Sequence, residues 1–321
     1  MTQSLALVFP GQGSQHLGML RELAERYSVV RTTFEEASEA LGYDLWHVVQ
    51  EGPEEALNAT TCTQPALLTS SVAVWRVWQE LEGPRPRVMA GHSLGEYSAM
   101  VCGGALSFAE GVRLVRLRGE AMQAAVPAGE GAMAAILGLD DAAVEQACAD
   151  AAQGAVVAAV NYNAPGQVVI AGNKPAVDRA VALCQEAGAK RALPLPVSVP
   201  SHCALMKPAA ERLAAAMNDV ELKTPRYTVI QNVDAHAHAD VETLRTRLVE
   251  QLYQPVRWTA CVEAMIDLGA EVIIECGPGK VLTGLNKRVA KGAKGLAVND
   301  PDSLSAALEL AREAVDQQAN D

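Results

Sequence analysis

A serine enclosed by glycines carries the strongest chemical signal in the chain, in the run Gly91-His92-Ser93-Leu94-Gly95. The run matches the G-x-S-x-G pattern of a nucleophile elbow, a tight turn that presents a serine hydroxyl above a parallel sheet. Apolar residues precede it and a helical pattern follows it, as that elbow requires. Backbone N–H groups at the start of the helix would face an oxyanion on an attached carbonyl. The run predicts a nucleophilic Ser93; the alternative is a glycine-rich turn with an incidental serine.

A serine nucleophile needs a base, and the chain has 6 histidines. His202 follows an expected strand over residues 193–199, at the strand end where open α/β sheets place their ligands. The alternative is a histidine at the start of a helix that Ser201 caps. His92 adjoins Ser93, and the turn should point the two side chains apart. Three further histidines lie in amphipathic or polar stretches: His47, His236 and His238.

An arginine on the apolar face of a predicted helix gives an independent clue. Over residues 108–126, at about 100° per residue, Arg113 and Arg116 share the solvated face, whereas Arg118 lies among aliphatic side chains. A buried guanidinium is costly unless an anion pairs with it. The anion is either a structural Asp or Glu or a ligand. A substrate carboxylate fits, because it accepts two parallel hydrogen bonds from arginine.

These residues must be positioned by strands that alternate with helices. Strands are expected at residues 5–9, 88–90, 227–230 and 272–275, and helices at 32–40, 64–81, 108–126 and 241–253, with a helical tail from about 303. Such alternation predicts an α/β fold in which helices cover both faces of a parallel sheet.

A middle segment has a different order of elements: strand, helix, strand, strand, helix, strand. The expected elements are 132–137, 140–152, 155–162, 167–171, 175–186 and 191–197. This is the split βαβ order of ferredoxin-like folds. We therefore expect residues 128–197 to form a ferredoxin-like subdomain inserted into a larger domain built from residues 1–127 and 198–321.

Composition restricts the partners and the compartment. The chain has 321 residues, 50% of them hydrophobic, and a formal net charge of -12, which argues against nucleic acid as a partner. Its 7 cysteines are odd in number and show no C-x-x-C spacing, so neither a disulfide framework nor a zinc site is expected. The N-terminus lacks the pattern of a signal peptide, and no apolar stretch is long enough to span a bilayer. We expect a cytoplasmic protein.

Several motifs occur in a specific order along almost the whole chain: FPGQGSQ at residues 9–15, GHSLGEYSA at 91–99, Arg118-Gly119, PSH at 200–202, QL at 251–252 with PVRW at 255–258, and GPGKVL at 277–282. In these motifs the chain resembles bacterial malonyl-CoA:acyl carrier protein transacylases of fatty acid synthesis. The resemblance implies a larger α/β-hydrolase-like domain, a ferredoxin-like insert, and an active site in the cleft between them.

The resemblance also implies residue roles. Ser93 is expected to be the nucleophile, His202 the general base and later the general acid, and Arg118 the residue that holds the malonyl carboxylate. Three further residues act through their backbones: the N–H groups of Gln12 and Leu94 form the oxyanion hole, and the carbonyl of Gln251 orients His202.

The implied reaction is a ping-pong transfer. Ser93 takes the malonyl group from malonyl-CoA, and the pantetheine thiol of an acyl carrier protein then removes it. No cofactor and no metal ion are implied beyond the coenzyme A thioester itself.

Two rival functions remain open. A serine thioesterase or esterase would share the G-x-S-x-G run, but Arg118 and the lack of an evident acid near His202 argue against it. A non-catalytic binding protein for acyl carriers would not need Ser93 and His202.

A basic run at residues 286–294 is a candidate docking surface for an acidic carrier protein, through Lys287, Arg288 and Lys291. Local charge complementarity would steer the encounter despite the acidic balance of the chain. The alternative is a solvated helix face.

Overall fold

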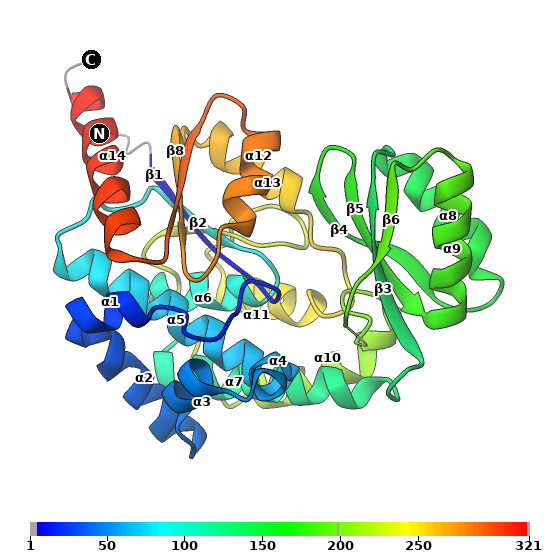
Figure 1. Ribbon diagram of the computed structural model, residues 1–321, viewed down its shortest axis with the longest axis horizontal. Coiled ribbons are helices and arrows are strands. Elements are labelled where there is room, and N and C mark those ends of the chain that lie inside the picture. Colours follow the sequence, from blue (N-terminus) through cyan, green and yellow to red (C-terminus); the bar gives the residue numbers. More distant parts are fainter. Residues whose placement is uncertain (1–4, 198, 320–321) are drawn as a thin grey trace.

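Two β-sheets organise the chain, and Figure 1 shows the smaller one standing to one side of the larger one. The computed structural model describes residues 5–197 and 199–319. The predicted domain boundary at Ser198 therefore lies outside the described residues. Among the described residues, no helix is long and apolar enough to cross a membrane.

The larger sheet is parallel throughout, as predicted. Its five strands lie in the order β7-β2-β1-β8-β9, and every neighbouring pair is parallel. The strands are β1 (Leu5–Phe9), β2 (Val88–Gly91), β7 (Thr228–Ile230), β8 (Val272–Cys276) and β9 (Lys294–Val298). Strand β9 was not predicted, because it begins inside the basic run that suggested a docking surface.

Helices cover both faces of this sheet, because the central strand is apolar on both sides. Leu5, Leu7 and Phe9 pack into one core, whereas Ala6 and Val8 pack into a second core on the opposite face. The helices that contribute to the first core are α1 (Arg21–Arg26), α2 (Ser28–Leu41), α3 (Leu45–Glu51), α4 (Glu54–Asn58), α5 (Thr60–Glu80), α6 (Leu94–Cys102), α7 (Phe108–Ala125), α10 (Lys207–Met217), α11 (Val241–Glu250) and α14 (Pro301–Ala319). The helices of the second core are α12 (Trp258–Asp267) and α13 (Val281–Val289).

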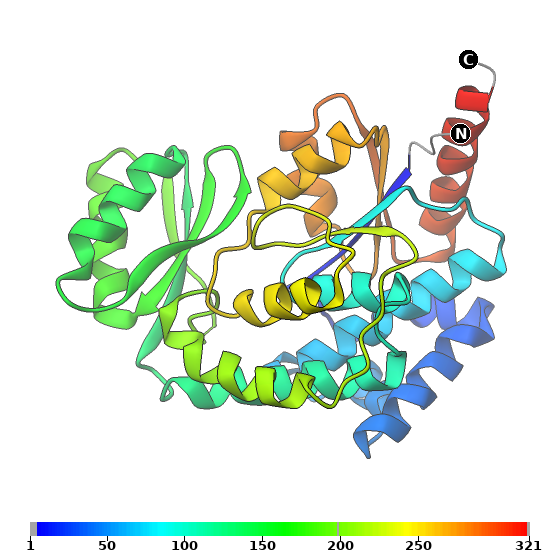
Figure 2. The ribbon, with the colours of Figure 1, turned by 180° about the vertical axis from the view of Figure 1, so that it is seen from behind.

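The smaller sheet is antiparallel, with strand order β4-β5-β3-β6. Its elements follow the predicted sequence: β3 (Gly131–Leu137), α8 (Asp141–Ala152), β4 (Val157–Ala164), β5 (Gln167–Asn173), α9 (Lys174–Glu186) and β6 (Arg191–Pro194). Both helices cover the same face, the one turned away from the larger sheet in Figures 1 and 2. The other face contributes Met133 and Val169 to a small apolar cluster with Cys203.

Two predicted elements are shorter than expected. The strand predicted over 191–197 ends at Pro194. Prolines at 194, 196 and 200 lack the N–H group that a strand ladder needs, which explains the early end. The helix predicted over 241–253 ends at Glu250, and the next residue, Gln251, closes it.

Candidate active site

The turn that holds Ser93 has the geometry of a nucleophile elbow. Ser93 lies between β2 and α6 with φ 52° and ψ -108°, a conformation that side-chain-bearing residues rarely adopt. A Cβ atom on Gly91 would lie 1.9 Å from the carbonyl of Gly95, and one on Gly95 would lie 2.0 Å from the carbonyl oxygen of Phe9. Both glycines are therefore required by close backbone approach, as the motif predicted.

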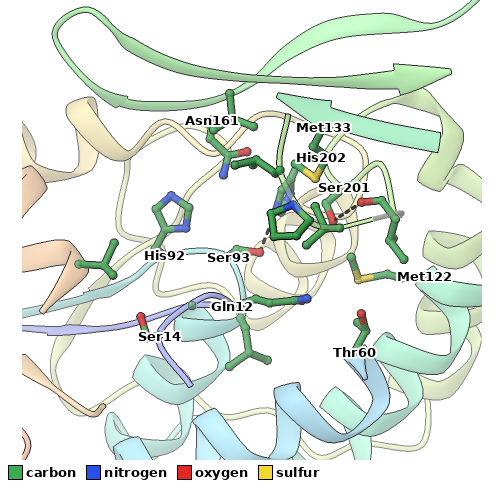
Figure 3. Close-up of a pocket in the computed structure, with 18 of the residues that line it drawn as sticks. Gln12, Ser14, Thr60, His92, Ser93, Met122, Met133, Asn161, Ser201 and His202 are labelled. Carbon is green, nitrogen blue, oxygen red and sulfur yellow. Dashed lines mark hydrogen bonds between the residues drawn. The ribbon is translucent and has the colours of Figure 1, made fainter. Parts of the chain in front are cut away.

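His202 is in hydrogen-bonding contact with the serine. Its Nε2 lies 2.8 Å from Ser93 Oγ, and its Nδ1 lies 2.6 Å from the backbone oxygen of Gln251 (Figure 3 shows the first contact). A carbonyl oxygen only accepts, so Nδ1 must carry the hydrogen and Nε2 is free to accept from the serine hydroxyl. Burial, and then the nearby Arg118 cation, lower the pKa of His202 to about 3. The imidazole is therefore neutral at physiological pH.

The sequence identified His202 for a reason that is wrong. Strand β6 ends at Pro194, and the described residues between Leu195 and Ser201 form no strand that leads to it. His202 lies in a turn with φ 63°, and its backbone N–H donates to the oxygen of Leu252 at 3.0 Å. Ser201 caps no helix either: its hydroxyl donates to the Val199 oxygen.

Arg118 is buried beside the nucleophile, with a relative exposure of 1%. Its guanidinium donates to Gln64 Oε1 at 2.9 Å, to Gln251 Oε1 at 3.0 Å and to Ser93 Oγ at 3.3 Å. Its Nε is buried without a hydrogen-bond partner in the described parts of the chain, where no Asp or Glu forms an ion pair with it. Of the two partners that the sequence left open, a structural Asp or Glu is thus not in ion-pair contact within the described residues, and the guanidinium faces the serine.

A second layer of polar groups holds the elbow in place. Asn232 Oδ1 accepts from the Ser93 backbone N–H at 2.8 Å, and Asn232 Nδ2 donates to the Gly91 oxygen at 2.8 Å. Sequence reasoning missed Asn232 and Gln64, because neither lies near Ser93 along the chain. Glu96 could have been predicted as part of the site, because it is an acidic residue in a helix that has no other charged residue.

The cleft above these residues has a volume of about 650 Å³. Both sheets contribute to its lining, with Met133, Asn161 and Val169 coming from the smaller one. His92 turns away from the serine, as expected, and its Nε2 contacts Asn163 Oδ1 at 2.7 Å, which joins the elbow to the smaller sheet.

Two backbone amides in the cleft are free to bind. Gln12 and Leu94 both line it, and neither backbone N–H has a hydrogen-bond partner within residues 5–197 and 199–319. A nucleophile, a neutral base, a buried cation and unused N–H donors together suit acyl transfer of a group that carries its own carboxylate. In the same described residues, no three His, Cys, Asp or Glu side chains are grouped to hold a metal ion.

The basic run begins on α13, a helix whose first half contributes to the lining of this cleft. Val281 and Leu282 of α13 line the cleft, and Lys287 and Lys291 are exposed further along the chain. Arg288 differs from these lysines, because it donates to the Pro165 oxygen at 2.6 Å and to Gln167 Oε1. It therefore ties α13 to the hairpin between β4 and β5.

Known proteins resemble this chain in sequence and in structure. A family model described as acyl transferase domain matches residues 6–303. The chain is 59% identical over 310 residues to the malonyl CoA-acyl carrier protein transacylase of Escherichia coli strain K12, covering 97% of this chain and 100% of that protein.

Two solved structures resemble it equally well. An acyl carrier protein S-malonyltransferase from Vibrio cholerae is 63% identical with a TM-score of 0.93, covering 94% of this chain and 99% of that one. A malonyl-transacylase in complex with its type II PKS acyl-carrier protein is 58% identical with a TM-score of 0.94, covering 95% and 99%.

Proposed function

The chain belongs to the acyl transferase domain family, and we propose that it moves a malonyl group from malonyl-CoA to the thiol of an acyl carrier protein through an ester on Ser93. One observation carries this proposal: the Ser93 hydroxyl lies 2.8 Å from a neutral histidine nitrogen and 3.3 Å from a buried guanidinium. The histidine activates the hydroxyl, and the guanidinium selects an acyl group that ends in a carboxylate. The name of the Escherichia coli relative gives this donor and this acceptor, and the name of the Vibrio cholerae structure gives the malonyl group and the carrier, which supports the proposal. The reaction we propose would supply fatty acid synthesis.

The first half-reaction acylates the serine. Ser93 Oγ forms a bond to the thioester carbonyl carbon while His202 Nε2 takes the hydroxyl proton. The negative charge on the carbonyl oxygen is stabilised by the N–H groups of Gln12 and Leu94. The C–S bond then breaks, and the protonated His202 gives its proton to the sulfur, so free coenzyme A leaves.

The second half-reaction reverses these roles. The carrier's pantetheine thiol gives its proton to His202 and forms a bond to the ester carbonyl, and Ser93 leaves with the proton returned by His202. The carbonyl of Gln251 keeps the imidazole in one tautomer through both halves, where many serine hydrolases use an aspartate. No cofactor is needed in this scheme beyond the coenzyme A thioester.

The finer description of the fold is also part of the proposal. We infer a larger α/β-hydrolase-like domain from residues 1–127 and 198–321, and a ferredoxin-like subdomain from residues 128–197. The order β4-β5-β3-β6 supports the second, since it places the first and third strands of the subdomain in the middle. We also propose that the protein acts in the cytoplasm, which its 7 free cysteines support.

Intact mass spectrometry tests the function. The protein is mixed with malonyl-CoA, and acyl carrier protein is added afterwards. We expect one malonyl adduct, absent from the Ser93→Ala variant, which then passes to the carrier. An adduct lost to water at the same rate with or without carrier would identify a hydrolase instead, and retained transfer by the Ser93→Ala variant would overturn the serine mechanism.

A further inference from the structure

A buried carboxylate that the proposed mechanism does not use lies directly beneath the nucleophile. Glu96 is the third residue of α6, and its exposure is 0%. It accepts three hydrogen bonds: from Gln231 Nε2 at 3.0 Å, from the Asn232 backbone N–H at 2.8 Å, and from Gln251 Nε2 at 2.9 Å. All three donors are neutral, and within the described residues no basic side chain forms an ion pair with Glu96.

Gln251 connects this carboxylate to the buried cation. One end of its amide, Oε1, accepts from Arg118 at 3.0 Å, and the other end, Nε2, donates to Glu96. Arg118 only donates and an ionised Glu96 only accepts, so the two charges fix the direction of the amide between them. The cation and the anion therefore lie one amide apart, and both side chains are buried.

The other titratable groups that interact with Glu96 are uncharged at neutral pH. Tyr97 on α6 and Cys261 on α12 both have their pKa raised, in each case mainly by burial. His202, across Gln251, is neutral because its pKa is lowered. Among these five described groups, Arg118 and an ionised Glu96 are then the charged ones, and a malonyl carboxylate beside Arg118 would be a second anion.

We propose that Glu96 is the internal counter-charge of Arg118. The Glu96 carboxylate weakens the binding of the malonyl carboxylate to Arg118. Glu96 then takes up a proton from solvent as the malonyl carboxylate enters the cleft. This inference rests on the proposed function, because it assumes a carboxylate-bearing acyl group at Arg118. A counter-charge compensates the buried guanidinium in the empty cleft, where an unpaired cation would be costly. It also keeps binding of the acyl group from becoming so strong that its release is slow.

The surroundings of Glu96 can hold either protonation state. Burial raises the pKa of Glu96 to about 7, so a modest change in the local charge is enough to protonate it. Gln231 donates to Oε1 of Glu96, while Oε1 of Gln231 is itself buried with no hydrogen-bond partner in the described chain. Gln231 Nε2 also donates to the Leu244 oxygen at 3.3 Å. When that amide turns over, it exchanges this weaker hydrogen bond for one in which its oxygen accepts the new O–H of Glu96. The bonds from Asn232 and Gln251 to the other carboxylate oxygen remain.

The same geometry makes Glu96→Gln a test of charge alone. An amide nitrogen in place of Oε1 would donate to the turned amide of Gln231, and the amide oxygen would still accept from Asn232 and Gln251. A residue with a merely structural role would weaken substrate binding when it is replaced. A counter-charge has the opposite effect, because its removal takes away the repulsion of the incoming carboxylate.

Isothermal titration calorimetry of the full chain separates these outcomes. The Ser93→Ala background prevents acylation, and the Kd of malonyl-CoA is compared with that of acetyl-CoA, which carries the same coenzyme but no carboxylate. We expect Glu96→Gln to tighten malonyl-CoA binding about tenfold at pH 8 and much less at pH 6, with acetyl-CoA unchanged. Buffers of different ionisation enthalpy should show proton uptake only where Glu96 is present.

A matched control and a variant-free measurement complete the test. Glu275→Gln replaces another fully buried carboxylate, one that caps α13, and should leave the ratio of the two Kd values unchanged. With Glu96 intact, that ratio should favour malonyl-CoA increasingly as the pH falls from 8.5 to 6. A ratio that ignores pH, or weaker malonyl-CoA binding by Glu96→Gln, overturns the inference. Failure of both Ser93→Ala proteins to bind malonyl-CoA would instead contradict the proposed function.

Discussion

At the scale of single residues, Gln251 is where the site converges. Its backbone oxygen accepts a hydrogen bond from His202 Nδ1, and its side-chain oxygen accepts one from Arg118. Its side-chain nitrogen donates to the Ser93 backbone oxygen at 2.9 Å. A displacement of this one residue would therefore disturb the base, the cation and the nucleophile together. Its place at the end of α11 gives it this reach, since both backbone and side chain leave the helix there.

Arg118 should determine the preference for malonyl groups. We expect Arg118→Ala to lower kcat/KM for malonyl-CoA about 10²-fold, because a charge-assisted pair of hydrogen bonds is lost, and to change that for acetyl-CoA little. Steady-state kinetics with both donors measures this. Arg116→Ala is the matched control: Arg116 lies on the solvated face of the same helix and pairs with Glu120, so both rates should stay within about twofold of the parent. An equal loss with both donors would contradict selection by Arg118.

The neutral state of His202 should appear in the pH dependence of stability. Its folded pKa of about 3 lies below the ordinary 6.5. Between these values the unfolded chain binds a proton that the folded chain does not, so His202 lowers stability as the pH falls from 6.5 towards 3. Glu96 acts in the opposite direction between 4.5 and about 7, because its folded pKa is raised. The two effects offset each other where these windows overlap.

Replacing His202 should remove the loss of stability that its protonation in the unfolded chain causes at low pH. Relative to the parent, His202→Asn should gain about 1.4 kcal/mol of stability for each unit that the pH falls below 6.5. Urea denaturation at several pH values measures the difference. Curves that stay parallel would mean that His202 titrates normally in the folded protein.

Sequence patterns found Ser93 and Arg118 and missed residues that only the folded chain brings to the site. Ser93 followed from its glycines, and Arg118 from its helix face. Gln12, Leu94 and Gln251 came only from the family resemblance, because a backbone group leaves no trace in residue type. Asn232 has no spacing relation to Ser93, so only the folded chain brings the two together.

At the scale of elements, the elbow depends on how closely β1 approaches α6. We expect Gly95→Ala to lower the free energy of unfolding by about 3 kcal/mol and to abolish transfer, because its Cβ would lie 2.0 Å from the Phe9 oxygen. Gly284→Ala in α13 is the control: nothing lies within 4 Å of its Cβ position, so it should stabilise by about 0.5–1 kcal/mol. Urea denaturation of both variants checks this. An active, stable Gly95→Ala protein would mean that the elbow can widen.

Most elements could be predicted, because apolar runs and helical periodicity report local burial. The exceptions have physical reasons. The strand predicted to residue 197 stops at Pro194, since closely spaced prolines cannot donate to a ladder. Strand β9 was not predicted, because an edge strand needs fewer apolar residues and this one starts with Lys294.

At the scale of the whole molecule, the cleft exists only because two sheets are held against each other. Arg288 joins α13 to the β4–β5 hairpin, and His92 joins the elbow to Asn163. Val256 accepts from the Tyr162 backbone N–H and donates to the Val160 oxygen, which adds a third connection. Arg288 thus has a structural role that its place in a basic run did not reveal, and the carrier docking surface is better sought in the lysines beside it.

Those lysines lead to a prediction about the carrier protein. The chain has a net charge of -12 and its expected carrier is also acidic, so docking needs a local basic surface. Lys287 lies on α13 and Lys291 just after it, both exposed, and the first residue of that helix, Val281, is an exposed apolar residue that lines the cleft. We expect the double variant Lys287→Glu and Lys291→Glu to raise KM for carrier protein about tenfold at low salt and less at high salt, because screening weakens exposed charges.

Measuring the two half-reactions separately shows whether the double variant affects only the step that uses the carrier protein. Acylation of Ser93 by malonyl-CoA, followed by intact mass, should proceed as in the parent, because neither lysine lines the cleft. Lys174→Glu is the control: this exposed lysine lies on α9, which covers the face of the smaller sheet turned away from the larger one, and should leave KM for carrier unchanged. A double variant with the parent's KM at every salt concentration would show that this run is only a solvated helix face.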